Sequence, residues 1–361
     1  MLILIIVAIL GFYIFLCMKK NKEDNIPIED KISQMLIIGY SDNPEIKHGI
    51  LDDIANNKVS GIIFYRHQIK SPESIKKKID ELNARNLSQY PLFIVVDQEG
   101  GKVSRIADEN GFKTYPSAKD IALKYTLDQA YQVYYEMAQK LKNVGFNFNL
   151  APCVDVNTNS SSFIASRNRI YSSNPEIVYK YSYEFVKAHR DSGILTALKH
   201  FPGLGSAGAD SHKLLPDITN TWVEEELVPF KKIISKFPDE PVMLGHVINK
   251  KIDAENISSI SDKTVAILNY NKNYNGLIVT DAIDMDAVEG IDISEIIIKA
   301  INAGVDIFIF PNHVYTPDNS KKYMPPDLFI KIVKDGIENG DISKEDIDKS
   351  YKKILKAKQN L

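Results

Sequence analysis

The segment KHFPGLGSAGADSH, residues 199–212, places several side chains that can exchange protons or bind hydroxyl groups in one short stretch. Lys199 and His200 open it, and Asp210 and His212 close it. A carboxylate bonded to one ring nitrogen of a histidine fixes the tautomer, and the other nitrogen can then give or take a proton near neutral pH. Asp210 and His212 are therefore a candidate acid/base pair, although the same residues also suit a plain turn.

The backbone between the two pairs is rich in glycine. Gly203, Gly205 and Gly208 allow positive φ angles that other residues avoid. The sequence therefore predicts a mobile loop that carries Asp210 and His212 over a bound ligand and excludes water from it.

Other ionisable side chains stand where apolar runs end. A hydrophobic core has no use for charges in those places, so a shared site is the better interpretation. The residues concerned are Asp97, Asp155, Arg169, Lys199, His200, His246 and Asp281.

Asp281 lies in GLIVTDAIDMDAV, directly after a run of apolar and β-branched residues. A carboxylate in that place can act as a nucleophile, a metal ligand or a general base. The alternative is an N-cap for the next helix. Asp284 and Asp286 lie closer to the following segment and suit the capping role better, so Asp281 stays a candidate for any of these three chemical roles.

The secondary-structure elements that position these residues alternate regularly along the chain. Strand-like runs alternate with helix-like stretches, which predicts an α/β fold with a single (β/α)8 barrel of the TIM type. A doubly wound open sheet is the rival, but neither GxGxxG nor GxxxxGK[ST] occurs. The strand runs are 35–40, 61–65, 92–97, 146–156, 194–201, 241–247, 276–282 and 305–311. The helical stretches are 71–86, 118–143, 174–192, 222–236, 261–270, 292–303, 325–339 and 343–358.

Residues 1–18, MLILIIVAILGFYIFLCM, carry no charged side chain. Their length suits a helix that spans a bilayer, so they are expected to form a membrane anchor or signal segment. A polar linker is expected at 19–27 and one catalytic domain at 28–361. The lysines that follow the span favour the cytoplasmic face by the positive-inside rule, with an exported form as the alternative.

Composition excludes several classes of protein. The 361 residues carry a net charge of −3, without the basic excess that a nucleic-acid surface requires. Two cysteines, Cys17 and Cys153, cannot build a disulfide framework or a thiolate zinc site. An amidohydrolase barrel would need an H-x-H pair after the first strand, where this chain has GYSD. No metal site and no cofactor are expected.

Together these blocks resemble glycoside hydrolase family 3, and within it the NagZ-type β-N-acetylglucosaminidases. The matching blocks appear in the family's order, and VDQEGG with KHFPG-x-G-x-x-x-x-DSH is a highly specific combination. The blocks are KISQMLIIGY, VSGIIFYRHQIKSPE, VVDQEGGKVSR, FNLAPCVDVN, KHFPGLGSAGADSH, GHV and IVTDAIDM.

The resemblance implies a role for each matching position. Asp281 corresponds to the nucleophile that forms a glycosyl-enzyme intermediate, His212 to the acid/base, and Asp210 to its paired carboxylate. The residues implied to hold the sugar are Asp97, Arg169, Lys199, His200 and His246, with Arg167 as a substitute for Arg169. Larger family members carry a second domain that supplies a glutamate acid. The chain ends two predicted helices after the last strand, so the DSH loop is expected to supply the acid here.

Two positions depart from the family pattern. Leu204 stands inside PGxG, where the family commonly has histidine or arginine, and Lys102 follows the paired glycines in place of the usual arginine. The first change removes a polar group near the loop base. The second keeps the charge and loses the fork geometry of a guanidinium.

The function implied is a retaining exo-β-N-acetylglucosaminidase that acts on muropeptides or related β-linked sugars. The alternatives are a β-glucosidase or β-xylosidase of the same family, and a membrane-tethered glycan-binding barrel without activity. A carbohydrate is the expected partner, and the oligomeric state cannot be inferred from the sequence.

Overall fold

The computed structural model describes residues 26–159, 161–208, 214–268, 270, 272–283, 290–311, 325–359 and 361. The hydrophobic segment 1–18 and most of the predicted linker lie outside these ranges, as do Asp210 and His212. Within them, no helix is both long and apolar enough to cross a membrane. The N-terminal membrane helix therefore stays a prediction.

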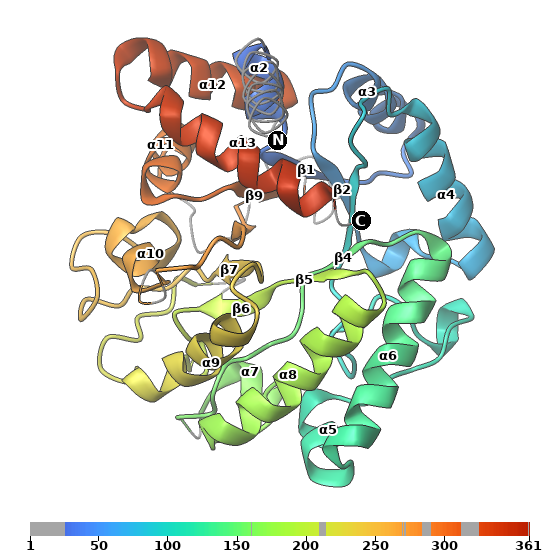
Figure 1. The fold of residues 1–361 in the computed structure, drawn as a ribbon, viewed down its shortest axis with the longest axis vertical. Coiled ribbons are helices and arrows are strands. Elements are labelled where there is room, and N and C mark those ends of the chain that lie inside the picture. Colours follow the sequence, from blue (N-terminus) through green and yellow to red (C-terminus); the bar gives the residue numbers. More distant parts are fainter. Residues whose placement is uncertain are drawn as a thin grey trace, which may run out of the picture.

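Parallel strands form a single sheet that curls into a nearly closed barrel (Figure 1). The sheet order is β5-β4-β3-β2-β1-β9-β8-β7-β6. The α/β fold and the parallel barrel predicted from the sequence are confirmed. The strands are β1 (Leu36–Gly39), β2 (Gly61–Phe64), β3 (Phe93–Val96), β4 (Phe148–Asn149), β5 (Leu195–Thr196), β6 (Leu198–Phe201), β7 (Val242–Leu244), β8 (Ile278–Ala282) and β9 (Ile307–Phe310).

The prediction of eight strands is wrong by one, because the predicted strand 194–201 divides at Ala197 into β5 and β6. β5 pairs with β4 and β6 pairs with β7, so the two edges of the sheet belong to consecutive pieces of chain. Pro152 follows β4 and has no N–H to donate, which interrupts the ladder there. A parallel bridge between Cys153 and Lys199 spans this seam: the Lys199 N–H donates to the Pro152 carbonyl at 3.2 Å, and the Val154 N–H donates to the Lys199 carbonyl at 2.8 Å.

Helices surround the barrel (Figure 1). At least one of them follows each strand that the sequence predicted. They are α2 (Ile28–Ser33), α3 (Pro44–Ala55), α4 (Pro72–Arg85), α5 (Ala118–Lys124), α6 (Leu127–Val144), α7 (Phe163–Ser166), α8 (Pro175–Asp191), α9 (Val228–Lys236), α10 (Asp262–Leu268), α11 (Ile293–Ala303), α12 (Pro326–Asn339) and α13 (Lys344–Lys358).

Local capping explains where the helices begin and end. The predicted helix 118–143 is two helices, because the Thr126 side chain accepts a hydrogen bond from the Gln129 N–H in a capping box and starts α6 there. Ser71 starts α4 in the same way, with Pro72 in its first turn.

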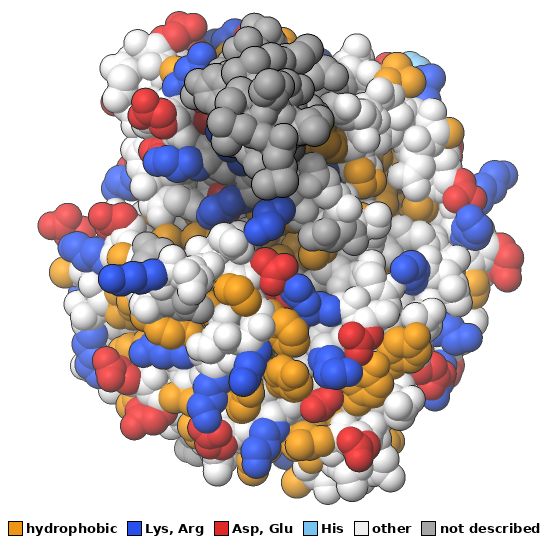
Figure 2. Space-filling model, in the orientation of Figure 1, with side chains coloured by type: hydrophobic (Ala, Val, Ile, Leu, Met, Phe, Trp, Pro, Cys, Tyr) orange, Lys and Arg blue, Asp and Glu red, His pale blue; other side chains and the backbone are white. Residues whose placement is uncertain are grey.

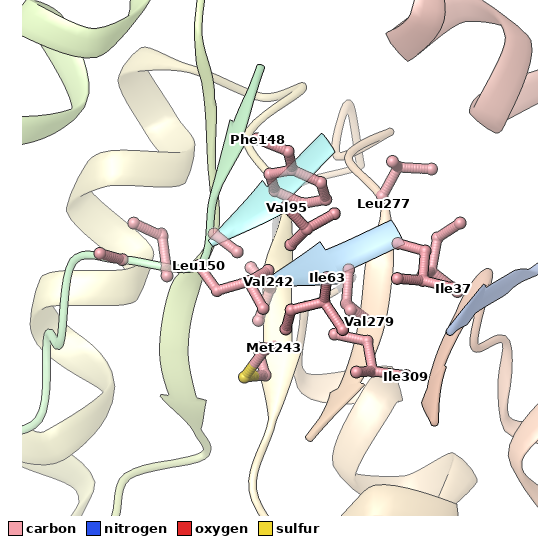
Figure 3. Packing of buried hydrophobic residues seen from close by; sticks show 14 of the residues in the cluster. Ile37, Ile63, Val95, Phe148, Leu150, Val242, Met243, Leu277, Val279 and Ile309 are labelled. Atoms are coloured by element: carbon pink, nitrogen blue, oxygen red, sulfur yellow. The ribbon is translucent and has the colours of Figure 1, made fainter. Parts of the chain in front are cut away.

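The barrel interior is filled by aliphatic and aromatic side chains from several strands (Figure 3). Continuous apolar runs are expected for strands that are buried on both faces. The interior is therefore a packed core and not a pore. Labelled examples are Ile37, Ile63, Val95, Phe148, Val242, Val279 and Ile309.

Acidic and basic side chains are interspersed over the face shown in Figure 2. Helices α12 and α13 lie on this face (Figure 1), and α13 carries the exposed Lys349–Asp346 pair at 2.7 Å. Exposed pairs of this kind contribute about 0–1 kcal/mol each.

A buried lysine closes the N-terminal end of the barrel. Lys358, on α13, is 2% exposed, and its Nζ donates to Gln34 Oε1 at 2.8 Å and to the Ser60 carbonyl at 3.0 Å. The Nζ also lies 4.9 Å from the centre of the Phe93 ring. Burial lowers the pKa of Lys358 to about 7.

This lysine is expected to make stability depend on pH. The unfolded chain holds the Lys358 proton up to its ordinary pKa of 10.5, whereas the folded chain releases it near 7. The unfolded state therefore binds more protons between these values, and the free energy of unfolding rises with pH there. Urea unfolding at pH 7 and pH 9 should show a rise of about 1–3 kcal/mol that is absent in Lys358→Met. An equal rise in both proteins would contradict the assignment.

Candidate active site

Six of the polar residues at the C-terminal ends of the strands line one cavity: Asp97, Arg105, Arg169, Lys199, His200 and Asp281. Asp97 follows β3, Lys199 and His200 belong to β6, and Asp281 belongs to β8. The barrel core supplies the floor through Ile63, Leu150, Met243 and Ile309. Five of the sequence-predicted residues thus meet in one place.

Asp97 lies between two cations. Lys199 Nζ is 2.9 Å from Asp97 Oδ1, and Arg105 donates to Asp97 Oδ2 at 3.2 Å. The Arg105 guanidinium also lies over the Tyr65 ring, 5.4 Å from its centre. Burial opposes ionisation of Asp97, but the attraction of Lys199 and Arg105 outweighs it and holds the pKa of Asp97 below its usual range.

Glu99 connects Lys199 to the third cation of the cavity, Arg169, although Glu99 is not part of the lining. Arg169 donates to it through Nε and one terminal nitrogen, each at 2.8 Å, and Lys199 Nζ lies 2.8 Å from Glu99 Oε1. Burial opposes the charge on Glu99, yet Arg169 and Lys199 lower the pKa of Glu99 to about 2. The two-pronged contact fixes the plane of the guanidinium.

His200 is oriented by a buried carboxylate. Its Nδ1 lies 2.8 Å from Asp155 Oδ2, and the Leu204 N–H donates to Asp155 Oδ1 at 2.7 Å. Asp155 is fully buried, and the neighbouring His200 holds the pKa of Asp155 below its usual range although burial opposes this. With Nδ1 directed to Asp155, His200 Nε2 faces Arg169 across 3.5 Å.

Replacing Asp155 by Asn is expected to turn His200 into the wrong tautomer, because an amide N–H₂ cannot accept the Nδ1 proton. We expect the kcat/KM for a glycoside substrate to fall by about 10–100-fold, the usual cost of removing such an orienting partner. The free energy of unfolding should fall by about 1–3 kcal/mol. Asp217→Asn is the matched control, since Asp217 is exposed and accepts a hydrogen bond from the Thr219 N–H. Equal kinetics in both variants would show that Asp155 does not orient His200.

Asp281 lines the cavity, and its Oδ1 accepts a hydrogen bond from the Ala282 N–H at 2.8 Å. His246 lies behind this strand end, is 1% exposed and does not belong to the residues that line the cavity. Its ring nitrogens contact Ser259 Oγ at 2.8 Å and the Ala282 carbonyl at 3.1 Å. Burial lowers the pKa of His246, with Asp281 acting in the opposite sense. His246 therefore supports the backbone that presents Asp281.

The base of the loop that leads to Asp210 and His212 is fixed by Glu226. This residue is fully buried, accepts from the Gly205 N–H at 3.1 Å and accepts from Thr158 Oγ1 at 3.0 Å. Burial and the charge of Asp155 raise the pKa of Glu226 to about 7.

At Gly203 and Gly205 in this loop base, the neighbouring atoms leave no room for a Cβ atom. A Cβ on Gly205 would lie 1.8 Å from the Val156 carbonyl oxygen, and one on Gly203 would lie 2.7 Å from a Glu226 oxygen. The sequence predicted mobility and positive φ angles from Gly203, Gly205 and Gly208, but of these three only Gly203 has a positive φ, of 124°, and Gly203 and Gly205 are buried. Asp210 and His212, which the loop would carry, lie outside the described residues.

A family model for the "Glycosyl hydrolase family 3 N terminal domain" matches residues 27–357. The chain belongs to glycosyl hydrolase family 3. Beta-hexosaminidase A of Pseudoalteromonas piscicida is 30% identical over 336 residues, which cover 85% of this chain and 54% of that protein. Beta-hexosaminidase LpqI of Mycobacterium tuberculosis is 28% identical over 295 residues, covering 78% of this chain and 72% of LpqI.

A solved structure supports the same placement. A glycoside hydrolase family 3 beta-N-acetylglucosaminidase from Paenibacillus sp. str. FPU-7 superposes with a TM-score of 0.82 at 28% identity, covering 93% of this chain and 62% of that one. The family 3 chain described here thus spans about half of Beta-hexosaminidase A and under two thirds of the Paenibacillus chain.

The structure separates the two arginine candidates of the family 3 domain. Arg169 lines the cavity, whereas Arg167 is exposed and lies over the Phe163 ring at 4.8 Å. The structure also locates the two residues that depart from the family pattern. Leu204 is 3% exposed in the core, and Lys102 is exposed outside the cavity lining.

Sequence reasoning missed three residues that shape this site: Glu99, Arg105 and Glu226. Glu99 and Arg105 lie within and just after the VDQEGG motif, so the motif itself was a usable signal. Glu226 lies in an acidic run, Glu224–Glu226, that suits an exposed helix start, and nothing local predicts its burial.

Proposed function

We propose that this chain is a β-N-acetylhexosaminidase that removes terminal β-linked N-acetylglucosamine with retention of configuration. One observation carries the proposal: Asp281 lines a cavity together with the polar side chains of Asp97, Arg105, Arg169, Lys199 and His200. Fixed cations and carboxylates of this kind bind sugar hydroxyl and amide groups, and a carboxylate beside them can attack an anomeric carbon.

The proposed reaction has two steps. Asp281 attacks the anomeric carbon while the acid protonates the leaving oxygen, and a glycosyl-enzyme ester forms. Water, deprotonated by the same group, then hydrolyses the ester and releases the sugar with its β configuration. The acid/base is His212, paired with Asp210. Both lie outside the described residues, and support for them comes from the anchored loop base at Gly205.

The names of the relatives support the sugar over the alternatives. The curated relatives are named beta-hexosaminidases, and the Paenibacillus structure is that of a beta-N-acetylglucosaminidase. A β-glucosidase or β-xylosidase has no such support. A glycan-binding barrel without activity would not need a carboxylate at position 281 in the cavity wall.

The proposed natural substrates are muropeptides or related cell-wall sugars, and residues 1–18 are proposed to anchor the protein in a membrane. The chain enters the barrel through α2 and β1, at the end opposite the cavity. Helix α2 contacts α12 and α13 there. A membrane attachment at that end would leave the cavity open toward the compartment that holds the substrate.

The experiment is the release of 4-nitrophenol from its β-N-acetylglucosaminide and its β-glucoside by the full chain. We expect kcat/KM to favour the first substrate by at least about 100-fold, because polar groups placed for an acetamido group reject a sugar that lacks it. NMR of the first product should show the β anomer. Asp281→Asn serves as the control for contaminating glycosidases.

Other outcomes reject parts of the proposal. Equal turnover of both substrates would support the β-glucosidase alternative. A first product of α configuration would exclude the retaining mechanism. Binding of N-acetylglucosamine without turnover of either substrate would support the glycan-binding alternative.

A further inference from the structure

Cys153, Asp155 and His200 form a buried cluster directly beneath the cavity. Cys153 is 2% exposed and His200 is 6% exposed. The Cys153 Sγ lies 3.1 Å from Asp155 Oδ2, and His200 Nδ1 lies 2.8 Å from the same oxygen. The proposed reaction does not use the thiol.

We propose that this cluster is an inhibitory site for a borderline or soft divalent cation such as Zn²⁺ or Cd²⁺. A thiolate, a carboxylate and an imidazole nitrogen are a ligand set that these ions prefer. Two cysteines are too few for an all-thiolate site, but a mixed set requires only one. The cluster is not a cofactor site, because the proposed two-step hydrolysis needs no metal.

The geometry suits such an ion. The three ligand atoms lie within 4.8 Å of one another. These atoms form a triangle in which the Sγ–Oδ2 side measures 3.1 Å and the Nδ1–Oδ2 side measures 2.8 Å. A point therefore exists that lies no more than about 2.5 Å from each of the three atoms. Bonds to Zn²⁺ measure about 2.0–2.3 Å, so shifts of a few tenths of an ångström complete the site. His200 lines the cavity, which gives the ion a path from solvent.

Binding of the ion releases one proton. The thiol hydrogen that points to Asp155 Oδ2 leaves as a proton, and the Nδ1 hydrogen of His200 moves to Nε2, which frees Nδ1 to bind the ion. The other carboxylate oxygen keeps its hydrogen bond from the Leu204 N–H, so Asp155 stays in place. The cluster therefore gains one unit of positive charge beside Arg169.

Occupation of the cluster would change what His200 presents to the cavity. A histidine that ligates through Nδ1 carries its proton on Nε2. His200 Nε2 lies 3.5 Å from a terminal nitrogen of Arg169, which is itself only a donor. Two donors would then face each other, and His200 could no longer accept a hydrogen bond from a sugar hydroxyl. The cation would therefore weaken substrate binding without touching Asp281.

The experiment compares Cys153→Ser with the parent in full chains that also carry Cys17→Ser, so that Cys153 is the sole thiol of the parent. Serine keeps a hydrogen bond to Asp155 and removes the soft ligand. Cd²⁺ titration should give the parent a thiolate charge-transfer absorbance that saturates at one equivalent, and the variant none. Zn²⁺ should inhibit the parent, and the midpoint should rise at least about tenfold in Cys153→Ser, a usual cost of losing a ligand contact.

The Cd²⁺ absorbance and the Zn²⁺ inhibition test different parts of the proposal. The absorbance needs no activity, so it tests the metal site even if the proposed function is wrong. Absence of a saturating absorbance in a parent with a normal thermal midpoint overturns the site. Saturating absorbance with equal Zn²⁺ midpoints in both proteins shows that the cation binds here but inhibits elsewhere, which overturns the inhibitory role. Cys153→Ala replaces the serine variant if the latter does not fold.

Discussion

Replacing Asp281 by Asn is expected to lower kcat for an aryl N-acetylglucosaminide by at least about 1,000-fold, because an amide cannot form the glycosyl-enzyme ester. The substitution keeps the size of the side chain, and its amide oxygen can still accept the Ala282 N–H. The cations and carboxylates of the cavity keep their partners, so KM and the thermal midpoint should change little. The measurement is steady-state kinetics together with thermal unfolding.

A smaller variant makes this test sharper. Asp281→Ala leaves space beside the anomeric carbon for an added anionic nucleophile. Azide should restore part of the turnover and give the glycosyl azide of α configuration, because it attacks from the side that Asp281 occupies. Recovery of the β azide, or turnover of Asp281→Ala within tenfold of the parent, would show that another group is the nucleophile.

Replacing Glu99 by Gln is expected to cost about 3–5 kcal/mol of unfolding free energy, since it leaves two buried cations without their shared carboxylate. Arg169 loses its two-pronged partner, and among the described residues Lys199 keeps the carboxylate of Asp97. A loose Arg169 should also lower kcat/KM by about 100-fold, which kinetics beside urea unfolding will measure. Glu109→Gln is the matched control. Glu109 pairs with Arg66 at the surface, with its side chain 55% exposed, and should cost less than about 1 kcal/mol.

Acid unfolding gives a second test of Glu99. Its pKa falls from 4.5 in the unfolded chain to about 2 in the fold. A carboxyl group of this kind contributes stability above pH 4.5, and that contribution is lost as pH falls toward 2. Glu99→Gln should therefore show a shallower loss of stability across this window than the parent. An equal loss of unfolding free energy between pH 4.5 and pH 2 in the two proteins would mean that the Glu99 ion pairs contribute nothing to stability.

Most of the barrel could be predicted from sequence because its strands are buried on both faces and read as unbroken apolar runs, such as FIVV in β3. The division of residues 194–201 into β5 and β6 could not be predicted, because it depends on which strand each half pairs with and on Pro152 across the seam. Helix α3 was missed as well. Its apolar positions are diluted by Lys47, His48 and Gly49, and only the Asn43 cap with Pro44 marks its start.

The candidate site shows the same limit. Charged residues at strand ends predicted the cavity lining, and Asp97, Lys199 and Asp281 lie there. The sequence did not predict ion pairs between residues that are far apart in the chain. An example is the pair of Glu99 and Arg169, which lie 70 positions apart. For His246, a strand-end position alone did not distinguish a residue of the lining from one that supports the strand behind it.

The junction between β5 and β6 lies at the reactive centre of the barrel. The ladder is irregular there, but the Ala197 and Lys199 N–H groups donate to the Ala151 and Pro152 carbonyls, and the Val154 N–H donates to the Lys199 carbonyl. The backbone that carries Lys199 and His200 is therefore hydrogen-bonded to the chain after β4 on one side and paired with β7 on the other. Strands held in this way in the core open at free energies close to that of global unfolding. Thermal or chemical stress would therefore remove the activity and the fold together, and the melting temperature would also measure how long the protein stays active.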